Sequence, residues 1–445
     1  MHNPVRANTV TRSNTTKQTN PPGLQSGTST TPDLYREMDG DINGRLGIDM
    51  GFTALIRTTP HPMSDGTVHG FRERHAILQR FQNRTLELFK ASLRGEADPV
   101  IARSVLGDVP AHLGHDFHNR LSELQHRRPV FFRTDEPVPG KLSELQCPGS
   151  GWCMAEEILT LYRNNTKLFG PSRHFPVSLA RSFARTLHTY LEAPPVVHHL
   201  TDNASRPHGM RYFIQRTREH GVKYFSYDRD VSPQDCNFVR SHDFITLPHH
   251  NFFTERMERC EQGLVNFDLS PSALFDGKII LSWPFWSRTR DHFDDEIRAL
   301  FPYTNLLDPE GFELPDGSRI APDHFCRMPR SKRNYYIKYA GTDIALNWGS
   351  KSVFLGSTLS NAQCRALMDT IVKDAQRGRH WILQEALQQS EQVTALGRDG
   401  ESFETTAHSK FSGFYGPDGL MGILVMQKAS HKVHGSSDTI MSVVP

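Results

Sequence analysis

The chain has 445 residues, enough for roughly two or three subdomains around a large core and an active-site cleft. Its 51 basic and 49 acidic residues give a formal charge of +2, so nucleic acid is not an expected partner. Neither a bilayer-spanning apolar run nor an apolar signal segment is found, which predicts a cytoplasmic protein with no membrane partner.

Residues 1–34 are rich in Asn, Thr, Ser, Pro and Gly and have almost no large apolar side chains. Such a composition cannot offset the entropy lost on ordering, so we predict a disordered tail. The basic residues Arg6, Arg12 and Lys17 precede any acid, which leaves a targeting peptide as the alternative, although no amphipathic helix accompanies them.

Hydrophobic periodicity and turn residues then predict a mixed α/β fold. The first part of the chain predicts a long amphipathic helix, a β-hairpin closed by a Pro/Gly turn, and a second helix, at 71–93, 129–146 and 152–163. A helix, a strand, a helix and a strand follow at 177–191, 196–200, 209–220 and 222–227, and this spacing is typical of an α/β unit with parallel strands. Later strands are predicted at 278–282, 335–339 and 381–385, helices at 294–300 and 362–374, and closing strands within 411–445.

The hairpin carries the first candidate site. Positions two apart on a strand share a face, so Arg133 with Asp135, and Glu144 with Gln146, are predicted to face one cleft. Two carboxylates and an amide oxygen suit Mg²⁺, and an arginine beside them suits a phosphoryl group that is being transferred. Taken alone, the same residues also fit an ordinary cross-strand ion pair on a solvent face.

A second candidate site begins at Lys338, on a predicted strand that leads to a polar, glycine-containing loop with Gly349 and Ser350. A lysine ammonium and free backbone amides hold phosphates in this way, although the sequence is not a Walker A motif. Lys278 offers another phosphate contact, and a surface lysine is the equal alternative for it.

The apolar strand predicted at 381–385 ends in Gln384 and Glu385. Such a strand can cover an adenine ring and leave polar groups for the base and ribose. Alone, it also fits a core strand that leaves a sheet.

Together, in this order across about 250 residues, the motifs resemble the circularly permuted ATP-grasp ligases, in particular the synthetase domain of the glutathionylspermidine synthetase type. The resemblance implies Arg133 as the catalytic residue, Asp135, Glu144 and Gln146 as metal ligands, and an ATP site with its base, ribose and phosphate contacts at Lys278, Lys338, Gly349, Ser350, Gln384 and Glu385. Gln146 replaces the asparagine usual in that family, and the Asn347–Ser350 loop is less acidic and poorer in glycine.

The resemblance also implies four regions: a tail at 1–34, a helical region with the metal-binding hairpin at 35–192, a pre-ATP-grasp-like α/β subdomain at 193–265, and the ATP-binding strands at 266–445. The expected reaction joins a carboxylate to an amine through an acylphosphate, using ATP and Mg²⁺, with small-molecule substrates. ATP-grasp relatives are often dimers, so the resemblance leaves a homodimer open, and the sequence itself does not determine the assembly. A catalytically inactive nucleotide-binding scaffold and a small-molecule kinase on the same fold are the alternatives. No sequence feature identifies the substrate-binding residues.

Overall fold

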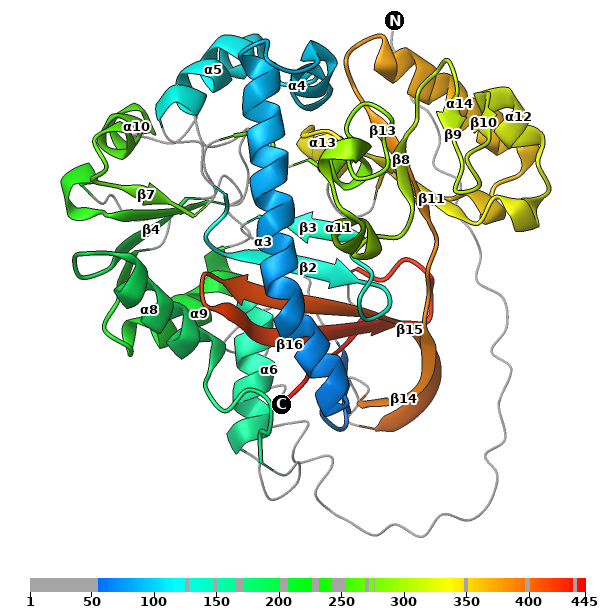
Figure 1. The fold of residues 1–445 in the computed structure, drawn as a ribbon. Coiled ribbons are helices and arrows are strands. Elements are labelled where there is room, and N and C mark those ends of the chain that lie inside the picture. Colours follow the sequence, from blue (N-terminus) through cyan, green and yellow to red (C-terminus); the bar gives the residue numbers. More distant parts are fainter. Residues whose placement is uncertain are drawn as a thin grey trace, which may run out of the picture.

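The computed structural model describes residues 55–124, 128–147, 150–164, 171–200, 207–225, 232–241, 253–268, 272–275, 277–347, 351–396, 401–434 and 438–445. The strands form three sheets and one short ribbon, and helices cover them (Figure 1). The α/β class predicted from the sequence is therefore confirmed. The predicted tail at 1–34 lies outside the described residues. In the described part, no helix is both long and apolar enough to cross a bilayer.

The largest sheet has seven strands and joins segments from both ends of the chain. Its order is β14 (Ser390–Leu396), β1 (Leu55–Arg57), β17 (Ile440–Val443), β16 (Gly419–Lys428), β15 (Ser402–Gly416), β2 (Phe132–Glu136) and β3 (Glu144–Gln146). The first half of β15 pairs with β14, and its second half pairs with β2. The predicted hairpin and the predicted closing strands therefore belong to one sheet.

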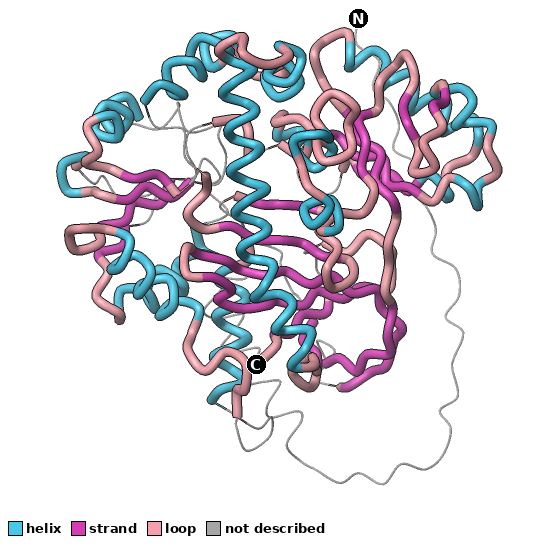
Figure 2. Tube along the Cα trace, viewed as in Figure 1, coloured by secondary structure: helices cyan, strands magenta, loops and turns pink. Residues whose placement is uncertain are grey.

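A second sheet has four antiparallel strands, in the order β12 (Val353–Leu355), β11 (Tyr335–Tyr339), β13 (Trp381–Glu385) and β8 (Thr304–Leu306). One of its faces packs on α12 (Pro322–Arg327) and α14 (Asn361–Ala375), through an apolar cluster that includes Ile337, Leu383 and Trp381. The predictions at 335–339, 362–374 and 381–385 are confirmed. Figure 2 shows the separate groups of strands in this arrangement.

The third sheet is the predicted α/β unit. Its strands run parallel in the order β5 (Lys223–Phe225), β4 (Val196–Leu200), β6 (Phe238–Ser241) and β7 (Asn266–Phe267). The predicted parallel pairing of β4 with β5 is confirmed. The helices α6 (Trp152–Asn164), α8 (Leu179–Tyr190) and α9 (Pro207–Arg218) share one apolar core with β4 to β6 and with β16 and β17.

The remaining elements connect and cover these sheets. The helices are α4 (Pro99–Leu106), α5 (His115–Leu124), α10 (Phe253–Glu261), α11 (Asp295–Ala299) and α13 (Ile344–Asn347). The short 3₁₀ helices are η3 (Ala111–Leu113), η4 (Pro233–Asp235), η6 (Ile279–Ser282), η7 (Arg290–His292), η8 (Arg330–Lys332) and η9 (Gly356–Thr358), and β9 (Phe312–Glu313) pairs with β10 (Arg319–Ile320).

The long helix α3 (Asp65–Leu93) crosses one face of the seven-stranded sheet (Figure 1). It begins six residues before the predicted start at 71, because the Ser64 side chain accepts a hydrogen bond from the Thr67 amide at 3.1 Å and caps the first turn. It ends before Gly95, whose φ of 76° favours glycine. The helix covers the sheet face that carries Phe132, so the opposite face is left for Arg133 and Asp135.

The prediction of a strand at 278–282 is wrong. Lys278 precedes the 3₁₀ helix η6, in which the Leu281 amide bonds the Lys278 carbonyl at 3.1 Å. Ile279, Ile280 and Leu281 are all buried, and a short apolar run that is buried on every side does not show by its periodicity whether it is a strand or a helix.

His118 anchors the segment that leads to Lys278. Its ring is fully buried, Nε2 accepts the Ala273 amide at 3.1 Å, and Nδ1 donates to the Gly114 carbonyl at 3.0 Å. Burial lowers the pKa of His118 to about 4, so the ring is neutral at pH 7.

We expect His118→Leu to lower the free energy of unfolding by about 2 kcal/mol, because the buried Ala273 amide loses its partner. Chemical denaturation measures this loss, and the same change at the exposed His112 serves as the control. Equal stability of the two variants would contradict the assigned anchoring role.

Candidate functional site

The hairpin register brings four of the predicted site residues onto one sheet face. Arg133 lies opposite Gln146, and Asp135 lies opposite Glu144. On the other side of β2, Ser412 of β15 lies opposite Asp135. Side chains opposite one another on paired strands share a face, so one surface presents a guanidinium, two carboxylates, an amide and a hydroxyl.

Asp135 is the buried centre of this surface, with no exposed area. Its Oδ1 accepts hydrogen bonds from Arg133 Nε at 2.9 Å and from Ser412 Oγ at 2.7 Å. Its Oδ2 accepts from Arg133 Nη2 at 2.9 Å and from Lys410 Nζ at 2.8 Å. Burial opposes ionisation, but Arg133 and Lys410 together hold the pKa of Asp135 well below its usual range.

Lys410 is a site residue that the sequence reasoning missed. It lies two positions before Ser412 on β15 and therefore shares its face. The alternation of Lys410 and Ser412 was a usable signal only once the pairing of β15 with β2 was known, and these strands are about 275 residues apart in sequence.

Glu144 and Lys278 form the next part of the site. Lys278 Nζ lies 3.1 Å from Glu144 Oε1 and also donates to the Asn347 side chain, at the end of α13. Burial opposes the ionisation of Glu144, but Lys278 and then Lys410 and Lys338 hold its pKa below the ordinary value. The structure therefore places Lys278 in the site rather than on the surface.

Lys338 comes to the same place from the second sheet. Its side chain is 8% exposed, and Nζ donates to Gln384 Oε1 at 2.6 Å and to the Ser143 carbonyl at 3.2 Å. Gln384 is held in turn, because its amide nitrogen donates to Thr304 Oγ1 at 3.0 Å. The contact with Ser143, the residue before Glu144, joins the two sheets at this point.

Burial and the neighbouring Lys278 and Lys410 lower the pKa of Lys338 to about 8, against the opposing effect of Glu144 and Asp135. An anionic ligand favours the charged form of Lys338, so ligand affinity is expected to fall as pH rises through 8. We expect the dissociation constant of a triphosphate ligand to increase about tenfold for each pH unit above about 8. Calorimetric titration between pH 7 and 9.5 measures this slope, and a flat profile would show that Lys338 does not contact the ligand.

Arg133 also holds the loop that follows the hairpin. Its Nη1 donates to the Ser150 carbonyl at 2.5 Å and lies 3.0 Å from Ser150 Oγ, and that hydroxyl donates to Gln146 Oε1 at 3.2 Å. The loop residue Gly151 has a φ of 89°, and a Cβ there would lie 3.1 Å from Arg133 Nη1. A glycine is therefore suited to this close approach.

Three of the predicted ATP contacts are not placed in this group. Gly349 and Ser350 lie outside the described residues. Glu385 lies opposite Tyr335 and, by strand alternation, on the other face of the second sheet from Gln384.

We use the name cationic cluster for the charged group at this site: Arg133, Lys278, Lys338, Lys410, Asp135 and Glu144. Four cations face two carboxylates, and the excess positive charge suits an anion with several charges. The cations come from four separate segments of the chain and are largely buried, so the cluster is unlike a solvated surface ion pair.

The residues fit a hard divalent cation in kind, since Asp135, Glu144 and Gln146 supply carboxylate and amide oxygens. Their present contacts are less suited to a metal ion, because Glu144 already pairs with Lys278 and Asp135 already pairs with Lys410. Across the described residues, no three His, Cys, Asp or Glu side chains come together as a group able to hold a metal ion.

Comparison with known proteins gives no sequence match, either to a family model or to a curated protein. Among solved structures, the chain is similar to a glutathione synthetase-like effector from Globodera pallida in its apo form, with a TM-score of 0.48 and 11% identity over 94% of this chain and 99% of the effector. It is also similar to a Methylobacillus flagellatus KT protein assigned as a gamma-glutamylcysteine synthetase, with a TM-score of 0.38 and 12% identity over 84% of this chain and 85% of that one. Likenesses of this degree assign no reaction to this chain.

Proposed function

We propose that the protein is an ATP-dependent carboxylate–amine ligase with a circularly permuted ATP-grasp type of site. The observation that carries the proposal is the cationic cluster, where Lys278 and Lys338 meet the hairpin residues Arg133, Asp135 and Glu144. The order of these residues along the chain agrees with the resemblance found in the sequence. The cytoplasmic location, the small-molecule substrates and the homodimer belong to the same proposal.

In this proposal the triphosphate of ATP lies at the cationic cluster. Lys278 and Lys338 bind phosphate oxygens, and Gln384 fixes the Lys338 ammonium through their 2.6 Å contact. The apolar strand β13 covers the adenine ring, with Gly349 and Ser350 as further nucleotide contacts. Arg133, Lys338 and Lys410 lie on strands, and Lys278 is held by Glu144 and Asn347. Little reorganisation of these cations is therefore needed when charge develops on the phosphates.

Glu144, Gln146 and Asp135 would hold Mg²⁺, which draws negative charge from the phosphate oxygens. Arg133, fixed by Asp135 and Ser150, lies on the same face and stabilises the phosphoryl group during transfer. A carboxylate oxygen of the substrate attacks the γ-phosphorus and ADP leaves. An amine nitrogen then attacks the acyl carbon, loses one proton, and phosphate leaves as the amide forms.

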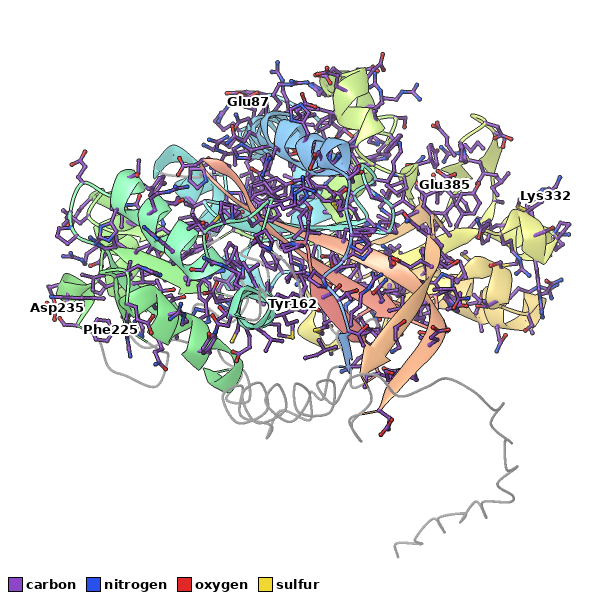
Figure 3. The ribbon with its side chains drawn as sticks, turned by 90° about the horizontal axis from the view of Figure 1, so that it is seen from below. Glu87, Tyr162, Phe225, Asp235, Lys332 and Glu385 are labelled. Carbon is purple, nitrogen blue, oxygen red and sulfur yellow. The ribbon has the colours of Figure 1, made fainter. Side chains whose placement is uncertain are left out.

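The test measures the ADP that purified protein forms from ATP and Mg²⁺ in the presence of pools of carboxylates and amines. We expect ADP release that requires Mg²⁺, a carboxylate and an amine. This release should be lost when Glu144→Gln is combined with Gln146→Leu. The matched control is Glu87→Gln, at an exposed glutamate on α3 that pairs with Arg84 (Figure 3). ADP release without an amine would favour the kinase alternative, and ATP binding without any release would favour the inactive scaffold.

A further inference from the structure

The carboxylate of Asp135 already has a donor for every acceptor position. Each carboxylate oxygen accepts two bonds, and the four donor atoms belong to Arg133, Ser412 and Lys410. An ionised carboxylate offers about four lone-pair positions in all. A divalent cation can therefore bind Asp135 only after at least one of these donors has moved away.

Lys410 is the donor that most resembles a bound cation. Lys410 is paired with Met426 of β16, and the pairing of β15 with β2 begins at the next residue, Phe411, so its backbone is held beside the hairpin. Its side chain is 14% exposed, and the ammonium lies 2.8 Å from a carboxylate oxygen that is fully buried. A compact ammonium at this distance supplies a positive charge with three donors to the centre of the cluster.

The charge balance argues in the same direction. The cationic cluster already has two more positive than negative side chains when its lysines are protonated. Burial lowers the pKa of Lys338, and Lys278 and Lys410 lower it further against the opposing effect of Glu144 and Asp135. Adding a dication to the ligand-free site is unfavourable, whereas adding a phosphate chain is favourable and supplies the negative charge that a dication needs.

We propose that Lys410 is a built-in cation that holds the metal position at Asp135, so that the cationic cluster binds the phosphate groups of a nucleotide without a divalent ion. This inference rests on the proposed function and assigns a further binding residue to the same site. A divalent ion is then needed for the reaction rather than for nucleotide binding.

The test uses the full chain and measures ATP binding by calorimetric titration and by thermal shift, with EDTA or with Mg²⁺. We expect wild type to bind ATP in EDTA with a dissociation constant within about tenfold of that in Mg²⁺. Lys410→Met should weaken binding in EDTA by about tenfold or more, because a charge-assisted contact is lost, and Mg²⁺ should restore it by binding the freed Asp135 oxygen.

Two further variants make the result specific. Lys410→Arg keeps the charge and should bind in EDTA like wild type, which also checks folding. Lys373→Met removes an exposed lysine of α14 and should leave the dissociation constant of ATP unchanged, both in EDTA and in Mg²⁺.

If Lys410→Met binds ATP in EDTA as tightly as wild type, the inference is overturned. If wild type binds ATP only with Mg²⁺, the inference fails and the proposed function stands. If wild type binds no ATP in either condition, both fail.

Discussion

Replacing Arg133 with Met is expected to lower ATP-dependent turnover by about a thousandfold, while the dissociation constant of ATP changes by less than about tenfold. Arg133 is 4% exposed and is held by Asp135 and Ser150 on the face where the reaction is proposed to occur. Its guanidinium would act on charge that develops during phosphoryl transfer, whereas Lys278 and Lys338 hold the phosphates in the ground state. Single-turnover kinetics and calorimetric titration separate the two effects.

Two controls are available for this prediction. Arg133→Lys keeps a charge but loses the paired contact with both Asp135 oxygens, so it should recover only part of the rate. Arg80→Met removes an exposed arginine of α3 that pairs with Glu296, and it should leave turnover unchanged. A loss of ATP affinity as large as the loss of turnover would show that Arg133 is a general phosphate contact instead.

Replacing Lys338 with Met is expected to change ligand-free stability and ATP binding in opposite directions. In the folded protein the pKa of Lys338 is about 8, below its ordinary value of 10.5, so its charge destabilises the folded state at pH 7. Losing that charge outweighs losing the hydrogen bond to Gln384, and we expect a gain on the order of 1–2 kcal/mol in unfolding free energy.

The same variant should bind ATP about a hundredfold more weakly, because a largely buried ammonium no longer meets a phosphate. Thermal denaturation with and without ATP shows both effects in one experiment: the ligand-free midpoint rises and the ATP-induced shift disappears. The stability gain should shrink between pH 8 and 10.5, where the wild-type Lys338 loses its proton in the folded state first. A ligand-free midpoint that falls, with the ATP shift retained, would contradict the placement of Lys338.

The parts of the site that were predictable from the sequence are those set by local rules. The Pro/Gly turn and strand alternation predict the hairpin, and the structure pairs Asp135 with Glu144 and Arg133 with Gln146. The strands around Lys338 and Gln384 are likewise predictable, because aromatic and aliphatic residues make up most of each of them.

The rest of the site depends on contacts between distant segments. Lys410 reaches Asp135 because β15 pairs with β2, and no local pattern specifies that pairing. Lys278 reaches Glu144 from the N-terminal end of a 3₁₀ helix in a segment with the apolar composition of a strand. Local periodicity predicts the individual helices and strands. The meeting of four cations at one point depends on how those elements pack together.

The most direct measurement is a crystal structure of the protein with Mg²⁺ and a non-hydrolysable ATP analogue. We expect phosphate oxygens within hydrogen-bond distance of Lys278 and Lys338, and the adenine ring against β13. A nucleotide bound elsewhere on the molecule, or none at a saturating concentration of the analogue, would contradict the assignment of the cationic cluster as a nucleotide site.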